Sequence, residues 1–146
     1  MGLAENAKAR FNYEILETYE AGLELLGFEV KSLKVGRGEL AGARVLIRGG
    51  EAFLVGATIP PYQVGNTPEG YEPARTRRLL LNKRQMAELA KAEETKGLTI
   101  VPLKVYNKGT KLKLSLAIAR GKKKYDKRET IKKRDVEREL GRTLKR

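Results

Sequence analysis

Residues 111–119 read Lys-Leu-Lys-Leu-Ser-Leu-Ala-Ile-Ala, so that aliphatic residues alternate with polar or small ones. Successive side chains of a β-strand point to opposite faces, and this pattern therefore predicts a strand with one core face and one mildly basic face. A second strand is predicted at 98–106, and residues 107–110, Asn-Lys-Gly-Thr, form the turn between them. The chain is expected to contain an antiparallel hairpin here.

A second hairpin is predicted upstream, from strands at 43–48 and 51–59. Gly49-Gly50 joins them, and two residues that both accept a positive φ are what a tight hairpin turn requires. A short strand is also predicted at 79–81, where three leucines follow one another. Residues 60–76 are interrupted by Pro and Gly and are expected to form a functional or mobile surface loop.

The stretch 11–25 carries apolar side chains at most odd positions, which is the period of a half-buried strand. These residues are Phe11, Tyr13, Ile15, Tyr19, Ala21, Leu23 and Leu25. A helix with Phe11, Ile15, Tyr19, Leu23 and Leu26 on one face also fits the sequence. We favour the strand because aromatic residues are enriched and because Gly22 would cost a helix about 1 kcal/mol.

Two helices are predicted. The shorter covers 28–35 and ends at Gly36, and the Gly-Arg-Gly that begins there is a turn without the spacing of a phosphate-binding loop. The longer starts at Lys83, because Asn82 and Gln85 have the spacing of a capping box, and it ends with Gly97 as the C-cap.

Strands outnumber helices in this order of elements, so the fold class is mainly β. We expect residues 1–119 to form a closed antiparallel barrel of the OB type, with one main helix and a short helix, and residues 120–146 to form a basic tail. OB barrels commonly present a strand face and its loops to oligonucleotides, although a fold alone does not give a function.

Composition excludes several classes of protein. The 146 residues include no Cys and no His, which excludes disulfides, thiolate or imidazole metal sites and His-based catalysis. Because the Asp and Glu residues also lack metal-binding spacing, we expect no metal, no cofactor and no enzymatic activity. No apolar run approaches the ~20 residues of a membrane span and no signal peptide is recognisable, so a soluble cytoplasmic protein is expected.

The positive charge is concentrated at the end of the chain. Residues 120–146 hold 13 Lys or Arg against 5 Asp or Glu, a net charge of +8 out of +13 for the whole chain. Such a basic arm is typical of proteins that bind a polyanion. After Thr130 the apolar residues are only Ile131, Val136, Leu140 and Leu144, one thin stripe on a possible helix. We therefore expect a tail that is disordered when free and helical when bound, with a merely solubilising tail as the alternative.

Four motifs carry a family resemblance that extends from Asn6 into the tail. They are Glu20-Ala21-Gly22, the run 29–34 (Glu-Val-Lys-Ser-Leu-Lys), the run 75–82 (Arg-Thr-Arg-Arg-Leu-Leu-Leu-Asn) and the run 121–128 (Gly-Lys-Lys-Lys-Tyr-Asp-Lys-Arg). In this order and spacing the chain resembles the SsrA-binding protein (small protein B) family of bacterial trans-translation.

The resemblance implies an OB-type barrel that binds the tRNA-like domain of transfer-messenger RNA (tmRNA, or SsrA RNA), as a monomer in a one-to-one complex. It further implies that the complex, charged by alanyl-tRNA synthetase and carried by elongation factor Tu, enters ribosomes stalled on messages without a stop codon. There the tail would occupy the decoding centre and the empty mRNA channel of the small subunit as a helix. The alternative is a ribosomal or translation-factor-like OB protein that binds RNA constitutively.

By the same resemblance, Asn6, Glu20 and Leu80 match positions at or near the RNA-binding surface. Core packing is the alternative for Leu80, and a solvated strand face is the alternative for Glu20. A carboxylate near RNA can accept from a base amino group or a 2′-hydroxyl. Nearby cations are expected to meet phosphates and so to position the RNA: Lys8, Arg10, Arg75, Arg77 and Arg78.

The tail residues expected to contact the ribosome are Lys122, Lys123, Lys124, Tyr125, Asp126, Lys127, Arg128, Ile131, Lys132, Lys133, Arg134 and Val136. Tyr125 lies close to Lys124 and Lys127 and can stack on an exposed base, a contact worth about 1 to 3 kcal/mol. By family match, residues 125–128 lie near the decoding centre. Val136 departs from many members, in which an aromatic residue is common at this position.

Overall fold

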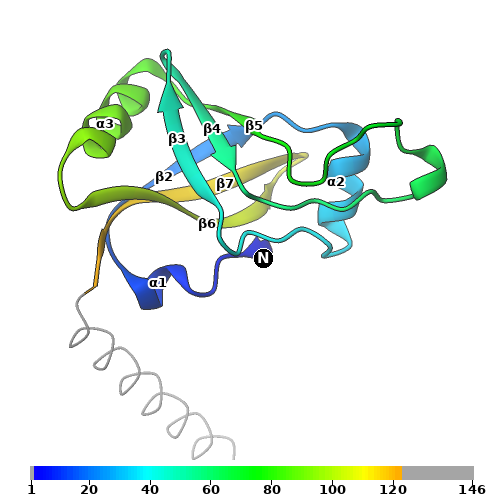
Figure 1. Ribbon diagram of the computed structural model, residues 1–146, viewed down its shortest axis with the longest axis horizontal. Helices are drawn as coiled ribbons and strands as arrows, with labels where there is room; N and C mark the ends of the chain where they lie inside the picture. Colours follow the sequence, from blue (N-terminus) through cyan, green and yellow to red (C-terminus); the bar gives the residue numbers. More distant parts are fainter. Residues whose placement is uncertain (1, 123–146) are drawn as a thin grey trace, which may run out of the picture.

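A computed structural model describes residues 2–122, and residues 1 and 123–146 lie outside the described part (Figure 1). Seven strands form one sheet in the order β1-β6-β7-β2-β5-β4-β3, and every neighbouring pair is antiparallel. The strands are β1 Gly2–Glu5, β2 Tyr13–Leu23, β3 Arg44–Arg48, β4 Glu51–Val55, β5 Arg77–Leu80, β6 Leu98–Lys108 and β7 Lys111–Gly121. The helices are α1 Ala9–Asn12, α2 Gly27–Lys34, α3 Lys83–Glu94 and the short 3-10 turn η1 Val64–Asn66.

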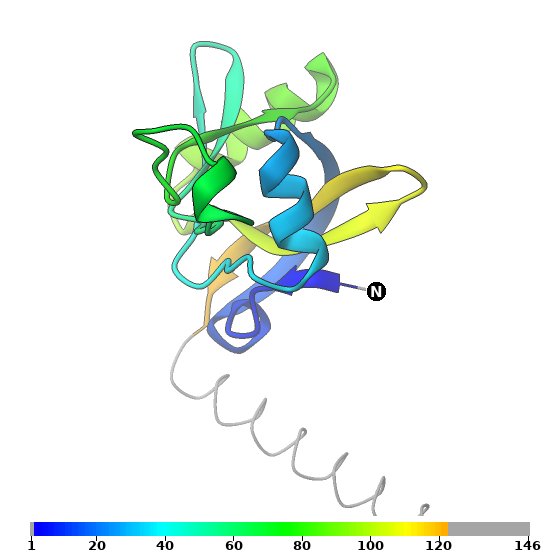
Figure 2. The same ribbon diagram turned by 90° about the vertical axis from the view of Figure 1, so that its right-hand side faces the viewer.

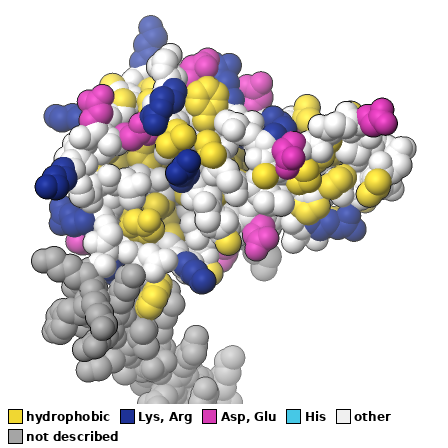
Figure 3. Space-filling model, viewed as in Figure 1, with side chains coloured by type: hydrophobic (Ala, Val, Ile, Leu, Met, Phe, Trp, Pro, Cys, Tyr) yellow, Lys and Arg dark blue, Asp and Glu magenta, His cyan; other side chains and the backbone are white. Residues whose placement is uncertain are grey.

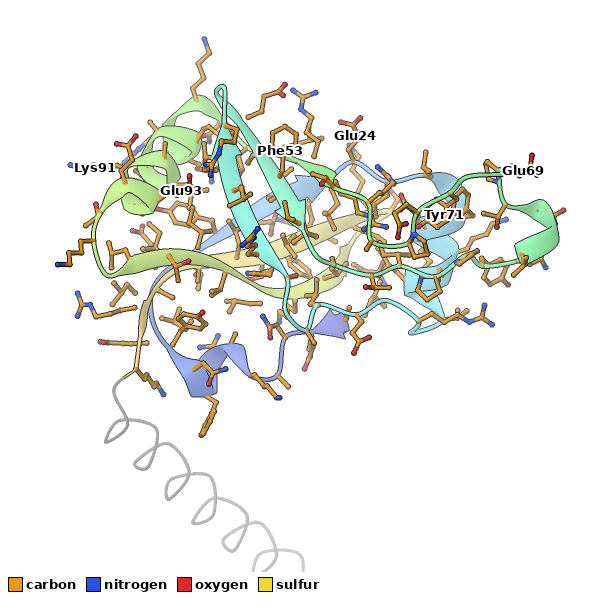
Figure 4. The ribbon with its side chains drawn as sticks, viewed as in Figure 1. Glu24, Phe53, Glu69, Tyr71, Lys91 and Glu93 are labelled. Carbon is orange, nitrogen blue, oxygen red and sulfur yellow. The ribbon has the colours of Figure 1, made fainter. Side chains whose placement is uncertain are left out.

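The mainly β class and the antiparallel hairpins are confirmed, but a closed barrel is not. β1 and β3 are the two edges of the sheet, and no ladder joins them within residues 2–122. The β3 edge is covered by α3, where Glu93 points toward the strand (Figure 4). The backbone N–H of Ile47 donates to Oε2 of Glu93 over 2.8 Å, and Arg48 pairs with the same carboxylate. A helix side chain thus occupies part of the β3 edge and hinders this edge from pairing with a strand of another chain.

The main hydrophobic core lies on one side of the sheet, with contributions from α2 and α3. Its fully buried side chains include Ala21, Leu54, Leu79, Leu114 and Leu116. Figures 1 and 2 show α2 beside the loop that precedes β5. The ring of Phe28 meets the ring of Tyr71 edge-on there, with 4.7 Å between their centroids.

A smaller apolar cluster lies on the opposite side of β6 and β7, where α1 covers them. It consists of Ala9, Val101, Leu103, Ala117 and Ala119, with Tyr13 and Ile15 packed against it. At this end the sheet is therefore buried on both faces. The remainder of this opposite side, which we call the outer face, has no helix of the described chain over it.

The structure corrects several predicted boundaries. Phe11 lies in α1 rather than in the long strand, which starts at Tyr13. β4 ends at Val55 instead of Ile59 because Gly56 adopts a φ of +83°, although Ala57 and Ile59 remain buried. α3 ends at Glu94, and Gly97, with a φ of +85°, serves the turn into β6. β7 continues to Gly121, two residues beyond the predicted end of the globular part.

The other predicted elements are present with shifted ends: β2 ends at Leu23 rather than at 25, β5 covers Arg77–Leu80 rather than 79–81, and β6 continues to Lys108, so that half of the predicted turn 107–110 is strand. β3 and β4 are joined through Gly49-Gly50, and both glycines have a positive φ. The capping box is present at α3, where the backbone N–H of Gln85 donates to Oδ1 of Asn82 over 2.8 Å. α2 occupies the predicted position. Within the described residues, no helix is long and apolar enough to cross a membrane.

Candidate nucleic-acid interface

The outer face displays a basic and aromatic set of side chains on four neighbouring strands. On β7, Leu112, Leu114 and Leu116 are buried, so the alternating residues Lys113 and Ser115 point to the other side. The same alternation and the strand register place on this side Lys104, Tyr106 and Lys108 from β6, Glu20 and Gly22 from β2, and Arg78 and Leu80 from β5. We define the outer face by these residues.

Glu20 is the acidic member of the outer face, and both of its oxygens have partners. Oε1 accepts from Nζ of Lys108 over 2.9 Å, and Oε2 accepts from the hydroxyl of Tyr106. These hydrogen bonds from Tyr106 and Lys108 lower the pKa of Glu20, because they favour the ionised carboxylate. Burial and the bond to Glu20 raise the pKa of Tyr106 to about 12, so its phenol stays protonated and donates.

Leu80 is half exposed, at 50%, whereas the adjacent Leu79 is 1% exposed. The alternative that Leu80 packs in the core is therefore wrong. Leu80 lies opposite Gly22 on β2. A Cβ placed on Gly22 would lie 3.2 Å from the Cβ of Leu80, so the glycine allows the leucine to lie close against the strand. An exposed apolar side chain thus lies on the same side of the sheet as Glu20, which precedes Gly22 by two residues on β2.

Asn6 lies in the turn between β1 and α1 and is held by two hydrogen bonds to β6. Its backbone N–H donates to Leu103 O over 2.8 Å, and its Nδ2 donates to Pro102 O over 3.0 Å. Lys8 and Arg10 are exposed beside it. A cleft of about 490 Å³ is lined by Asn6, Arg10, Lys104 and Ser115, among others. The structure thereby connects the Asn6 turn to the outer face.

The three arginines of the predicted cluster have different environments. Arg78 points to the outer face and pairs with Glu51 over 3.1 Å. Arg77 points into the core and is completely buried. Its guanidinium donates to the Glu29 carboxylate, to the Tyr71 hydroxyl and to the backbone oxygens of Ala57, Pro73 and Arg75. The expectation that Arg77 meets a phosphate is therefore corrected, because strand alternation places it inside.

Arg75 is 30% exposed and also bonds to Glu29, with 3.1 Å from Nε to Oε2. Burial alone would raise the pKa of Glu29, but hydrogen bonds from Arg75, the Leu26 N–H and Arg77 outweigh it and lower the pKa to about 2. Arg75 and Arg77 thus fasten the loop of residues 60–76 to α2 and β5. The role that the structure supports for this pair is the positioning of that loop.

The sequence-based assignment left out five side chains of the outer face: Lys104, Tyr106, Lys108, Lys113 and Ser115. The alternation in residues 111–119, which predicts a mildly basic face, was the signal that could have identified Lys113. Of the expected tail contacts, only Lys122 is described, and its backbone N–H donates to Asn12 O over 2.9 Å. The other expected tail contacts, from Lys123 to Val136, lie outside the described residues.

The arrangement of side chains on the outer face is suited to binding a partner molecule. Among residues 2–122, no three Asp or Glu side chains gather as metal ligands would. The view in Figure 3 shows Lys and Arg scattered among hydrophobic and acidic side chains, with no broad single-sign patch among the coloured residues. The outer face differs because three lysines surround one carboxylate and one tyrosine. Such a combination offers phosphate contacts and an aromatic ring to a nucleic acid.

Comparison with known protein families assigns the chain to one of them. The family model described as "SmpB protein" matches residues 3–146. The chain belongs to the SmpB protein family. A relative from Gloeothece citriformis called "SsrA-binding protein" is 49% identical over 99% of this chain and 93% of its own length. A relative of the same name from Mesoplasma florum is 51% identical over 98% of this chain and 96% of its own length. Another, from Chelativorans sp., is 52% identical over 98% of this chain and 92% of its own length.

A solved structure resembles this member of the SmpB family in fold as well as in sequence. It is described as "tmRNA-SmpB: a journey to the center of the bacterial ribosome". The similarity has a TM-score of 0.68 and 43% identity, and it covers 87% of this chain and 92% of the other chain. The family predicted from the four sequence motifs is therefore confirmed.

Proposed function

We propose that this SmpB-family protein binds the tRNA-like domain of tmRNA and delivers it to stalled ribosomes for trans-translation. The observation that carries the proposal is the outer face, which brings Glu20 and Leu80 together on one side of the sheet of a chain whose relatives are called SsrA-binding proteins. The cleft beside Asn6 continues this surface.

The side chains of the outer face have different roles in RNA recognition. Lys104, Lys108 and Lys113 neutralise phosphates, which fixes the position of the RNA without reading its sequence. Leu80 offers an apolar contact to the face of a nucleobase or a ribose. Asn6, whose orientation is fixed by two backbone oxygens of β6, lies at the adjoining cleft, where Arg10 adds positive charge.

The tail is proposed to act on the ribosome. Residues 122–136 would lie in the decoding centre and the empty mRNA channel, folding as a helix on the RNA that surrounds them. The tail starts beside α1, where the Lys122 N–H bonds to Asn12 O, at one end of the sheet. In this proposal the protein is a monomer with one tmRNA, acts in the cytoplasm with elongation factor Tu and alanyl-tRNA synthetase, and makes or breaks no covalent bond.

Binding to RNA tests the first half of the proposal. The affinity for a fragment containing the tRNA-like domain is compared with the affinity for tRNA and for ribosomal RNA fragments as salt is raised. We expect a preference for the tRNA-like fragment that persists while every affinity falls steeply with salt. Equal affinities would favour a constitutive ribosomal or translation-factor-like protein instead.

Truncation tests the second half. The chain is shortened after Lys122, which keeps all of β7 and its contact with Asn12. The shortened protein should bind the tRNA-like fragment with nearly unchanged specificity but should not support peptide tagging on stalled ribosomes. Full tagging by the shortened protein would refute the role of the tail while leaving the RNA-binding role intact.

A further inference from the structure

The carboxylate of Glu20 is already engaged on both of its oxygens in the absence of RNA. Nζ of Lys108 lies 2.9 Å from Oε1 and 3.3 Å from Oε2, and the Tyr106 hydroxyl bonds to Oε2. An ionised carboxylate is an acceptor only, so an RNA donor would have to compete with a charged ammonium and a phenol. Its negative charge would also repel nearby phosphates. These features argue against Glu20 as the principal contact with RNA.

The two donors that Glu20 holds are well suited to RNA. Nζ of Lys104 lies 5.7 Å from the centroid of the Tyr106 ring, and Lys113 is the register partner of Tyr106 on β7. The ring is therefore surrounded by cations and fixed at its hydroxyl end. Stacking on an aromatic ring and phosphate contacts with lysines are the two general means of holding RNA without reading its sequence.

We propose that Glu20 is a positioning residue for RNA binding. It holds Tyr106 and Lys108, and these two side chains contact the RNA. Glu20 fixes the Tyr106 ring for contact with a nucleobase or ribose and fixes the Lys108 ammonium for contact with a phosphate. This inference rests on the proposed function, since it specifies how the same surface recognises RNA. It differs from the reading in which the Glu20 carboxylate itself accepts from a base amino group.

A double-mutant cycle separates the two readings. The variants are Glu20→Gln, the pair Tyr106→Phe with Lys108→Met, and all three together, each tested for binding to the tRNA-like fragment. Glu20→Gln alone should weaken binding about tenfold, the size of a lost charge-assisted interaction. In the Tyr106→Phe/Lys108→Met background the same change should cause no loss and should slightly strengthen binding, because a negative charge is removed.

Equal losses in both backgrounds would overturn the proposal and establish a direct contact by Glu20. The absence of any loss in the wild-type background would also overturn it. Thermal unfolding of each variant shows whether the fold is retained, and Lys108→Met alone replaces the paired background if that pair unfolds. If the wild-type protein itself shows no preference for the tRNA-like fragment over tRNA, the proposed function fails, and that outcome is distinct from a failed cycle.

Lys111 provides a matched control for charge. It lies on the same hairpin, where it is the register partner of Lys108, and it is exposed. Lys111→Met removes the same charge as Lys108→Met without disturbing the contacts of Glu20. We expect Lys108→Met to weaken specific binding about tenfold and Lys111→Met to weaken it less than threefold. Equal effects would reduce the role of Lys108 to general electrostatics and would contradict the proposal.

Discussion

Arg77 and Glu29 form an ion pair in which both side chains are completely buried, with 2.7 Å between Nη2 of the guanidinium and Oε2 of the carboxylate. The pair connects β5 with α2, and the Tyr71 hydroxyl donates to the same carboxylate over 2.9 Å. Two elements and the loop before β5 therefore meet at one charged group. These polar contacts therefore help to fix the loop against α2 and β5.

Removing one partner of this pair should destabilise the fold strongly. Arg77→Met leaves a buried carboxylate with Arg75 as its remaining cation, and we expect a loss of about 3 to 5 kcal/mol in the free energy of unfolding. Urea denaturation measures it. Arg84→Gln is the control, because Arg84 is exposed in an i, i+4 pair with Glu88 and should change stability by about 0.5 kcal/mol or less. Similar effects of the two substitutions would contradict the importance of the buried pair.

Because the pKa of Glu29 is lowered in the folded protein, we expect the protein to lose stability in acid. The pKa of Glu29 is about 2 in the folded protein, against 4.5 as its ordinary value. A lowered folded-state pKa stabilises the protein above pH 4.5, and this contribution disappears as the pH falls through 4.5 toward 2. Its size is on the order of 3 kcal/mol.

The measurement compares urea midpoints at pH 6 and pH 3. Glu20 also has a lowered pKa and contributes with the same sign, so the comparison is made between Glu20→Gln and Glu20→Gln/Glu29→Gln proteins. The double variant should lose much less stability between the two pH values than the single variant does. The same dependence on pH in both proteins would show that Glu29 does not carry the effect.

The sequence was informative wherever a local pattern determined the structure. Alternation at 111–119 predicted β7, Gly49-Gly50 predicted the β3–β4 turn, and Asn82 with Gln85 predicted the start of α3. α1 was missed because a four-residue helix without a side-chain cap leaves no periodic signal. Closure of the sheet depends on how β1 and β3 lie in space, which no local pattern specifies.

The candidate site was only partly predictable for the same reason. Arg77 and Arg78 are chemically identical neighbours, and only the side of β5 on which each one lies separates a core residue from a surface residue. Leu79-Leu80-Leu81 contains no alternation that could reveal the exposed member. Tyr106 and Lys108 acquire a role through Glu20, which is more than 80 residues away in sequence. Such contacts follow from strand pairing and cannot be read from spacing.

Leu79 and Leu80 should respond oppositely to truncation. Leu79→Ala removes a buried side chain and should cost about 2 to 5 kcal/mol of stability. Leu80→Ala removes a half-exposed one, so the stability should change by less than about 1 kcal/mol while binding of the tRNA-like fragment weakens about fivefold. Urea denaturation and RNA titration of the two variants check both statements. Unchanged RNA binding by Leu80→Ala would remove Leu80 from the interface.

Gly22→Ala tests whether Leu80 must lie against β2 to act. The new methyl group would lie 3.2 Å from Cβ and 3.4 Å from Cδ1 of Leu80, so the leucine has to shift by a few tenths of an ångström. Since Leu80 faces solvent, the stability should change by about 1 kcal/mol or less, whereas RNA binding should weaken severalfold. Gly27→Ala is the control, because nothing lies within 4 Å of its added Cβ, and it should leave RNA binding unchanged. In a Leu80→Ala background, Gly22→Ala should cause little further loss of RNA affinity. A full additional loss would mean that RNA binding depends on the backbone of β2 rather than on the position of Leu80.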